Sequence, residues 1–328
     1  MESLVFAFNS VAPIVIMAAL GYFLRKAGIV GNEFSAAGNR LVFKVLLPVM
    51  LFTNVYKIED IRNFDFGHVG YALVMITVVF FAAVFSSGFV TKEGKKRGAL
   101  VQAIFRSNYA LIGIPLAGSL FGTEGIAAAA VLSAFAIPLF NVLAVTELLF
   151  FSGNGKKPGF KKILCDIEKN PLIQGVAAGF AALFIREIFV FAGISFRLFD
   201  IVPVQKVAEY ISSMATPLSL IVLGADFEFS AISALKKEIV FGTFMRCVFV
   251  PVLGIGTAFL LFKNSFGGAQ FAALAALFSA PVAVSSVPMA HELGGDSSLA
   301  GQLVIWTTVF SAGTIFVASF LLKTAGIF

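Results

Sequence analysis

Residues 66–90 read FGHVGYALVMITVVFFAAVFSSGFV, a stretch of 25 residues without Asp, Glu, Lys or Arg. A helix crosses the apolar core of a bilayer in about 20 residues, so this stretch predicts a transmembrane helix. A transmembrane β-strand needs only about 9–11 residues, which makes this run far too long for one. The fold class that follows is α-helical.

Runs of the same kind recur along the whole chain. Of its 328 residues, 59% are hydrophobic and 13% are charged, and the mean hydropathy is +0.96. A soluble domain carries about 25% charged residues, so soluble and disordered proteins are both excluded. We expect an all-α polytopic membrane protein with ten transmembrane helices, at about 4–24, 36–56, 66–90, 98–121, 124–151, 171–191, 206–225, 238–262, 270–290 and 298–322.

The Lys and Arg residues predict how these spans are oriented. Cytoplasmic loops collect basic residues. The odd-numbered loops hold 14 of them: Arg25, Lys26, Arg40, Lys92, Lys95, Lys96, Arg97, Lys156, Lys157, Lys161, Lys162, Lys169, Lys236 and Lys237. The even-numbered loops and the C-terminal tail hold 6: Lys57, Arg62, Arg197, Lys206, Lys263 and Lys323. We therefore expect both termini outside the cytoplasm of a plasma or inner membrane, with lipids and no nucleic acid as partners.

A short basic stretch, residues 152–170, separates five spans (1–151) from five more (171–328) and suggests an internal duplication. Shifted by 173 residues, GIPLAGSLFGTEGIA from Gly113 lies over SVPMAHELGGDSSLA from Ser286 with five identities. Pro13 and Pro48 also have counterparts, which are Pro171 and Pro217. Because five is odd, the second repeat has to be inverted, which is typical of secondary transporters.

Proline and glycine interrupt the fourth and the ninth span at corresponding positions. The fourth contains RSNY from Arg106 followed by Gly113, Ile114 and Pro115; the ninth contains Pro281, then Ser285, Ser286 and Pro288. Proline removes a backbone donor and breaks the hydrogen-bond ladder, which lipid does not tolerate unless protein, water or ligand supplies partners. The helix that follows such a break offers free amides and a positive dipole end, which suit a carboxylate. We expect the two breaks to cross and to form the binding site.

Two arginines lie deepest in their spans. For Arg106 two explanations stay open, attraction of an anionic substrate or snorkelling of its long side chain to the cytoplasmic face. We expect Arg246 to be structural and to pair with Asp226 or Glu228. Glu147 and the Arg186–Glu187 pair lie toward the ends of their spans and are expected at the membrane interface. Neither histidine has metal-ligand spacing, and no metal or other cofactor is expected.

These residues resemble the auxin efflux carrier family, which includes plant auxin carriers and bacterial malate and malonate permeases. The likeness rests on Asn108 with the block GIPL at Gly113–Leu116, and on Gly38-Asn39-Arg40 with Pro48 in the second span. Asn170-Pro171, Arg246 with Pro251, and Pro281 with Glu292 fit as well. The central loop is short, so the regulatory phosphorylation of the plant proteins is not carried over.

The resemblance implies a scaffold of helices 1, 2, 6 and 7 that faces a transport domain of helices 3–5 and 8–10, with helices 4 and 9 broken and crossing. It implies small organic anions as substrates and Asn108 as the substrate-contacting asparagine, with the stretch Val49–Asn54 as the facing wall. The full set of expected substrate-binding residues is Asn108, Arg106, Gly113, Ile114, Pro115, Pro281, Ser285, Ser286, Pro288, Val49, Phe52 and Asn54.

The predicted function is a secondary transporter of auxin-like monocarboxylates or malate- or malonate-like dicarboxylates, working by alternating access without covalent chemistry. Coupling to Na⁺ or H⁺ and assembly as a homodimer stay open. So do two alternatives, namely a sodium-coupled bile-acid-type symporter or cation antiporter of similar fold, and a membrane sensor that binds the anion without moving it. The sequence does not choose among them.

Overall fold

The computed structural model describes residues 2–58, 66–152 and 165–328. Within these ranges the chain is helical, and its one β-type contact is a single antiparallel residue pair. The all-α prediction is therefore confirmed. Residues 153–164, which make up most of the expected basic linker 152–170, lie outside the described ranges.

Seven helices in the described residues are long and apolar enough to cross a membrane. They confirm a polytopic helical membrane protein, and two of the expected spans, 66–90 and 171–191, agree closely with the helices found. The seven are Asn32–Tyr56, Gly67–Val90, Tyr109–Phe151, Pro171–Phe191, Val202–Ala225, Lys236–Phe262 and Ser297–Thr324.

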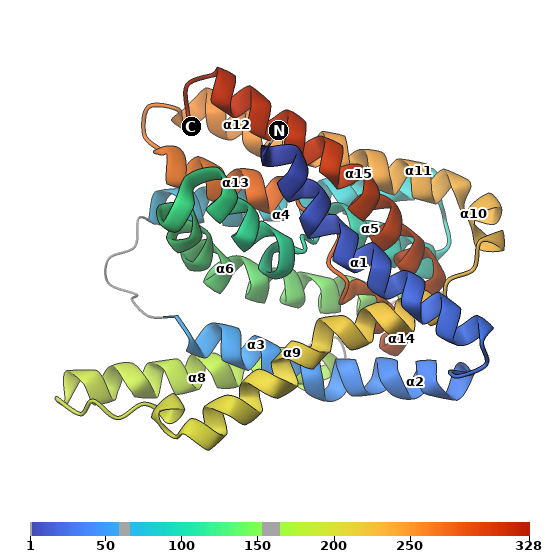
Figure 1. Cartoon of the computed structure of the whole chain (residues 1–328), viewed down its shortest axis with the longest axis horizontal. Coiled ribbons are helices and arrows are strands. Elements are labelled where there is room, and N and C mark those ends of the chain that lie inside the picture. Colours follow the sequence, from blue (N-terminus) through green and yellow to red (C-terminus); the bar gives the residue numbers. More distant parts are fainter. Residues whose placement is uncertain (1, 59–65, 153–164) are drawn as a thin grey trace.

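One layer of the molecule lies in the lower part of Figure 1, where α3 packs on α8 and α9. Helix α1 runs along α9 and also touches α15 (Ser297–Thr324), which belongs to a second layer described below. The elements of this layer are α1 (Glu2–Lys26), α2 (Asn32–Leu41), the π-helical turn η1 (Val42–Leu46), α3 (Leu47–Tyr56), α8 (Pro171–Phe191), the short η3 (Leu198–Asp200) and α9 (Val202–Ala225).

Glycines let the helices of this layer approach very closely. A Cβ on Gly21 of α1 would lie 2.1 Å from the Ile221 carbonyl oxygen of α9, and one on Gly224 of α9 would lie 1.8 Å from the Ala18 carbonyl oxygen of α1. Small residues at such contacts are common between membrane helices, because close packing replaces the missing hydrophobic drive. These backbones touch directly.

The second layer occupies the upper part of Figure 1, where α13 packs on α6 and α12, and α5 packs on α4, α6 and α15. Its elements are α4 (Phe66–Val90), α5 (Gly94–Phe105), η2 (Tyr109–Gly113), α6 (Ile114–Ser152), α10 (Ser230–Ala234), α11 (Lys236–Phe244), η4 (Met245–Phe249), α12 (Val250–Phe262), α13 (Gly268–Ser279), α14 (Ser286–Glu292) and α15 (Ser297–Thr324).

Helix α6 is folded back on itself rather than straight. Its backbone leaves helical geometry at Phe121 and at Gly122, where φ is 60°. This left-handed conformation suits glycine, which has no Cβ to clash. A Cβ on Gly125 would lie 2.2 Å from the Ala117 carbonyl oxygen, a contact impossible eight residues apart in a straight helix. The turn falls between the expected spans 98–121 and 124–151.

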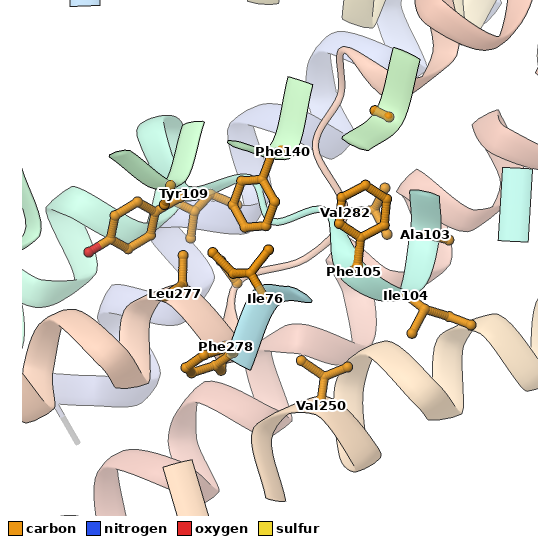
Figure 2. Packing of buried hydrophobic residues seen from close by; sticks show 14 of the residues in the cluster. Ile76, Ala103, Ile104, Phe105, Tyr109, Phe140, Val250, Leu277, Phe278 and Val282 are labelled. Atoms are coloured by element: carbon orange, nitrogen blue, oxygen red, sulfur yellow. The ribbon is translucent and has the colours of Figure 1, made fainter. Parts of the chain in front are cut away.

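Large apolar side chains pack around the helix ends that meet in the second layer. Figure 2 shows Phe105, Tyr109 and Phe140 from one part of the chain beside Leu277 and Val282 from another. All five are buried, and Phe105 and Phe140 have ring centroids 6.0 Å apart. This packing fixes the two interrupted helices relative to each other.

Candidate functional site

Both predicted interruptions are present, and they lie side by side. Helix α5 ends at Phe105 and η2 begins at Tyr109, while α13 ends at Ser279 and α14 begins at Ser286. The extended segments between them pair in antiparallel fashion through Ser107 and Val282, and the Asn108 N–H donates to the Pro281 carbonyl oxygen at 2.8 Å. The backbone polar groups freed by one break are thus partly satisfied by the other.

Arg246 satisfies most of the remaining carbonyl groups. Its guanidinium, 1% exposed, donates to the Ala280 oxygen at 2.6 and 2.9 Å and to the Leu277 oxygen at 3.1 Å, both at the end of α13. It also donates to the Ile104 oxygen at 3.2 Å, at the end of α5. The expected pairing of Arg246 with Asp226 or Glu228 is therefore wrong. Its planar guanidinium binds the ends of both broken helices, where several carbonyls need donors at once.

The side chain of Ser107 adds a further link, because its hydroxyl donates to the Leu277 oxygen at 2.7 Å. The Val282 N–H donates to the Thr307 hydroxyl of α15 at 3.2 Å. Arginine, serine and threonine side chains thus take the place of the lost helical hydrogen bonds and tie the paired breaks together into one platform.

A small cavity of about 70 Å³ lies against this platform, between the two layers of helices. It is lined from the breaks, from α3 of one layer, from α6 of the other and from α9. Its lining comprises Leu47, Met50, Leu51, Asn54, Arg106, Ser107, Asn108, Tyr109, Ala110, Leu111, Ile137, Phe140, Asn141, Ala215, Thr216, Ser219, Ala283, Val284 and Ser285. Residues from both halves of the chain therefore converge on one point.

Arg106 lines this cavity and is 4% exposed. Its guanidinium donates to the Asn141 amide oxygen at 2.8 Å and to the Gln102 amide oxygen at 3.2 Å. Since the head group is held inside the protein by neutral partners, the snorkelling explanation for Arg106 is wrong. A buried cation whose hydrogen-bond partners are neutral leaves its charge available to an anion.

Asn108, 8% exposed, also lines the cavity, and its side-chain amide nitrogen has no hydrogen-bond partner among the described residues. Buried amide donors are almost always satisfied, so an exception calls for an explanation. An acceptor atom of a bound molecule would supply the missing partner. The hydroxyls of Ser279 and Ser286, at the ends of the second break, are buried and without a hydrogen-bond partner among the described residues as well.

Four of the expected substrate-binding residues meet at the cavity: Arg106, Asn108, Ser285 and Asn54. The other eight, Gly113, Ile114, Pro115, Pro281, Ser286, Pro288, Val49 and Phe52, are not among its lining residues. Of these, Pro281 contributes the carbonyl that receives Asn108, and Phe52 stacks on Tyr56 with ring centroids 5.9 Å apart. Whether any of the twelve contacts substrate stays a prediction.

Gly113 has a packing role that the structure makes explicit. A Cβ at this position would lie 2.2 Å from the Tyr109 ring, whose hydroxyl donates to the Ala273 oxygen of α13 at 3.2 Å. The glycine of the GIPL block thus lets Tyr109 lie flat against its own helix and bind α13. This contact sets the first turn after the break.

A larger cavity of about 460 Å³ adjoins the small one and shares Asn54, Ala110 and Ile137 with it. Lys57 also lines this larger cavity, together with Ile114 and Ser133. A third cavity, of about 690 Å³, contains Arg25, Lys26, Asp226 and Glu228 and shares no lining residue with the small one. The small cavity therefore borders the larger one, a vestibule beside Lys57, and shares no lining residue with the third.

Two residues near span ends are buried by protein, and their expected depth at the membrane interface stays a prediction. Glu147 is 2% exposed and lies inside the protein. Arg186 is buried too, and it donates to the Tyr56 oxygen at 3.0 Å and the Ile58 oxygen at 2.6 Å, where α3 ends. Distance along a span does not reveal which face of the helix meets protein.

Gln102 and Asn141, the hydrogen-bond partners of Arg106, were not anticipated. A signal for Gln102 existed, since a polar residue four positions before Arg106 in a helical run lies on the same face. Asn141 is on a different helix, and nothing in the spacing connects it to Arg106. Only the folded-back α6 brings it there.

Comparison with known proteins points to membrane transport. Residues 6–157 match the family described as "Membrane transport protein". An uncharacterized transporter of Methanothermobacter thermautotrophicus is 24% identical over 317 residues, covering 92% of this chain and 94% of the relative. An uncharacterized transporter of Methanocaldococcus jannaschii is 26% identical over 313 residues, covering 91% and 93%.

A third relative, from Rhizobium meliloti, is named "Putative malonate transporter". It is 24% identical over 331 residues, covering 97% of this chain and 96% of the relative. These matches agree with the residues of the fourth span that carry the likeness, which lie within the matched range 6–157. Residues 6–157 thus match a membrane transport family, and relatives named as transporters align over nearly the whole chain, which indicates a transporter rather than an enzyme.

Proposed function

We propose that this protein is a secondary transporter of small organic carboxylates that works by alternating access. The observation that carries the proposal is the small cavity at the paired breaks, which contains the buried Arg106 guanidinium and the unpartnered Asn108 amide. A carboxylate offers two acceptor oxygens and a negative charge, so it satisfies both groups at once. The malonate named for the Rhizobium relative is a molecule of this class.

The proposed fold has ten transmembrane helices in two inverted repeats. The helix Tyr109–Phe151 folds back at Gly122 and so counts as two spans, and the interrupted pair α13–α14 counts as one more. With α1, which is 25 residues long, the total is ten. A bilayer core of about 30 Å accommodates each of these segments.

The helix contacts support the inversion. Gly21 and Gly179 correspond, because each follows its aligned proline, Pro13 or Pro171, by eight residues. Gly21 of the first span packs on α9, the seventh span, and Gly179 of the sixth span packs on Phe52 and Val55 of the second. An inverted five-span repeat maps a contact between spans 1 and 7 onto a contact between spans 6 and 2. The same glycine therefore serves equivalent contacts in both halves.

In this proposal α1, α2, α3, α8 and α9 form the scaffold, and the second layer is the transport domain. The cavity lies where the two meet, so a shift of one layer against the other changes the side from which it opens. Its position beside the vestibule at Lys57 fits one of the two states. With the orientation expected from the basic residues, that vestibule faces outside.

Flux in proteoliposomes tests the function. Purified protein would be reconstituted, and uptake of labelled malonate, malate and indole-3-acetate would be followed with and without sodium. We expect uptake of at least one of these acids, together with its binding in a thermal-shift assay. Binding without flux would identify a sensor, and sodium-dependent uptake of a bile acid alone would identify a symporter of the other class.

A further inference from the structure

Glu147 is an acidic side chain buried inside a membrane-spanning segment. It lies on the second arm of α6, 2% exposed, and neither carboxyl oxygen has a hydrogen bond of normal geometry among the described residues. A Cβ on Gly98 of α5 would be 3.4 Å from its Oε2, so the carboxyl is packed against the neighbouring backbone. A carboxyl group in this environment is stable only if it is protonated or if a nearby cation balances its negative charge.

The nearby cation is Arg106. Gln102 connects the two, because its amide oxygen accepts from Arg106 at 3.2 Å while its amide nitrogen, otherwise without a partner, is the polar group next to Glu147. Arg106 follows Gln102 by one helical turn and Gly98 by two, so the three residues share the face of α5 that packs against Glu147. Arg97, at the start of α5, is turned away to the Phe151 ring and the Val84 oxygen.

Arg106 therefore lies between two places for a negative charge. One is the Glu147 carboxyl behind Gln102, and the other is the cavity that Arg106 lines with Asn108. When the cavity is empty, an ionised Glu147 balances the guanidinium charge. When an organic anion enters, two negative charges compete for one buried cation, and protonation of Glu147 relieves that competition.

We propose that Glu147 is a proton-binding site and that a proton on Glu147 accompanies each organic anion bound beside Arg106. This inference rests on the proposed function, since it requires an anion in the cavity. The proton comes from water through the open vestibule and leaves with the anion after the layers shift. The transporter is then a proton–anion symporter.

Thermodynamic linkage determines the direction in which pH changes the affinity for the anion. If anion binding raises proton affinity at Glu147, then protonation must raise anion affinity by the same factor. Affinity for the anion accordingly falls as the pH rises, by up to about tenfold per pH unit for one coupled proton. The mutant Glu147→Gln, whose amide resembles the protonated acid in shape and charge, should bind with the high affinity at every pH.

Calorimetric titration of the purified wild-type protein with malonate provides the first test. Between about pH 7 and about pH 9 malonate stays a dianion, so its own titration does not interfere. Titrations in two buffers of different ionisation enthalpy count the protons taken up. We expect close to one proton per malonate in the wild type and none in Glu147→Gln.

Transport provides the second test. In proteoliposomes, an inward proton gradient should drive malonate accumulation by the wild type but not by Glu147→Gln, which should still exchange internal for external malonate. Glu124→Gln, an exposed glutamate on the same helix α6, serves as the matched control and should behave as wild type.

Malonate binding by the wild type without proton uptake would overturn the proton site and leave the anion site standing. Gradient-driven accumulation by Glu147→Gln would also overturn it. Failure of every carboxylate tested to bind the wild type would overturn the anion transporter and the proton site together. The wild-type calorimetry decides the question even if Glu147→Gln does not fold.

Discussion

The backbone N–H of Asn108 donates to the carbonyl oxygen of Pro281 at 2.8 Å, which joins the breaks of two helices 173 residues apart in sequence. Each break frees polar groups that lipid does not satisfy, and each supplies part of what the other lacks. The side chain of Asn108 takes no part in this bond and keeps its amide donors for the cavity. The backbone of Asn108 thus holds the two breaks together, while its side chain is available to a bound molecule.

Asn108→Ala should weaken malonate binding without unfolding the protein. A hydrogen bond to a charged acceptor contributes about 1.5–3 kcal/mol, so we expect Kd to rise by about one to two orders of magnitude. Calorimetry in detergent and uptake in proteoliposomes measure this. Gln174→Ala, at the exposed start of α8, is the control. Unchanged affinity and uptake in Asn108→Ala would remove this residue from the site.

Arg246→Met should destabilise the whole transport domain. The substitution leaves the buried carbonyls of Ala280, Leu277 and Ile104 without donors, at about 1–3 kcal/mol for each unsatisfied group. Arg246→Lys should recover only part of this loss, because an ammonium group cannot reach both helix ends with a planar fork.

The melting temperature in detergent measures this effect, with the exposed Lys323→Met as the control. A melting temperature of Arg246→Met equal to that of the control would show that water molecules replace the arginine as hydrogen-bond donors to these carbonyls. The role assigned to Arg246 in holding the breaks together would then fail.

Gly113→Ala should damage the site through Tyr109. A Cβ 2.2 Å from the Tyr109 ring forces the ring away from Ala273, and overpacking of this kind costs about 1–3 kcal/mol. The double mutant Gly113→Ala/Tyr109→Leu should lose less than the sum of the two single mutants, since the smaller side chain leaves room. If the losses in melting temperature of the two single mutants simply added, the effect of Gly113→Ala would not act through Tyr109.

The helices and the two breaks could be predicted from the sequence because hydropathy and proline act locally. The run 171–191 and the helix Pro171–Phe191 coincide, since a mostly apolar run of 21 residues with an Asn-Pro start is long enough to cross a bilayer as one helix. The interruptions followed from the missing N–H of Pro281 and from the small residues near Gly113, which act on their own helix.

Partners across helices could not be predicted in the same way. Arg246 was expected to meet a carboxylate, and it meets carbonyl oxygens, because the breaks make backbone acceptors available that no charge pattern reveals. The burial of Glu147 could not be predicted either, because the rotation of α6 about its axis is set by packing on α5 and α13. The site consists mainly of such cross-helix relationships.

Gly224→Ala should destabilise the scaffold, whereas Gly256→Ala should not. A Cβ on Gly224 would lie 1.8 Å from the Ala18 oxygen, so α1 and α9 must separate. A Cβ on Gly256 of α12 meets nothing within 4 Å, and alanine there adds up to about 1 kcal/mol of helix propensity. Melting temperatures compare the pair directly. Equal values would mean that the α1–α9 contact does not depend on this glycine.

The orientation can be tested with the two native cysteines. Cys165 lies half-buried between α6 and α8, on the side expected in the cytoplasm, and Cys247 is buried. A membrane-impermeant maleimide should therefore label the protein in inside-out vesicles and leave it unlabelled in intact cells. Cys165→Ser should abolish the labelling. Labelling in intact cells would invert the topology, and the vestibule beside Lys57 would then open to the cytoplasm instead of the outside.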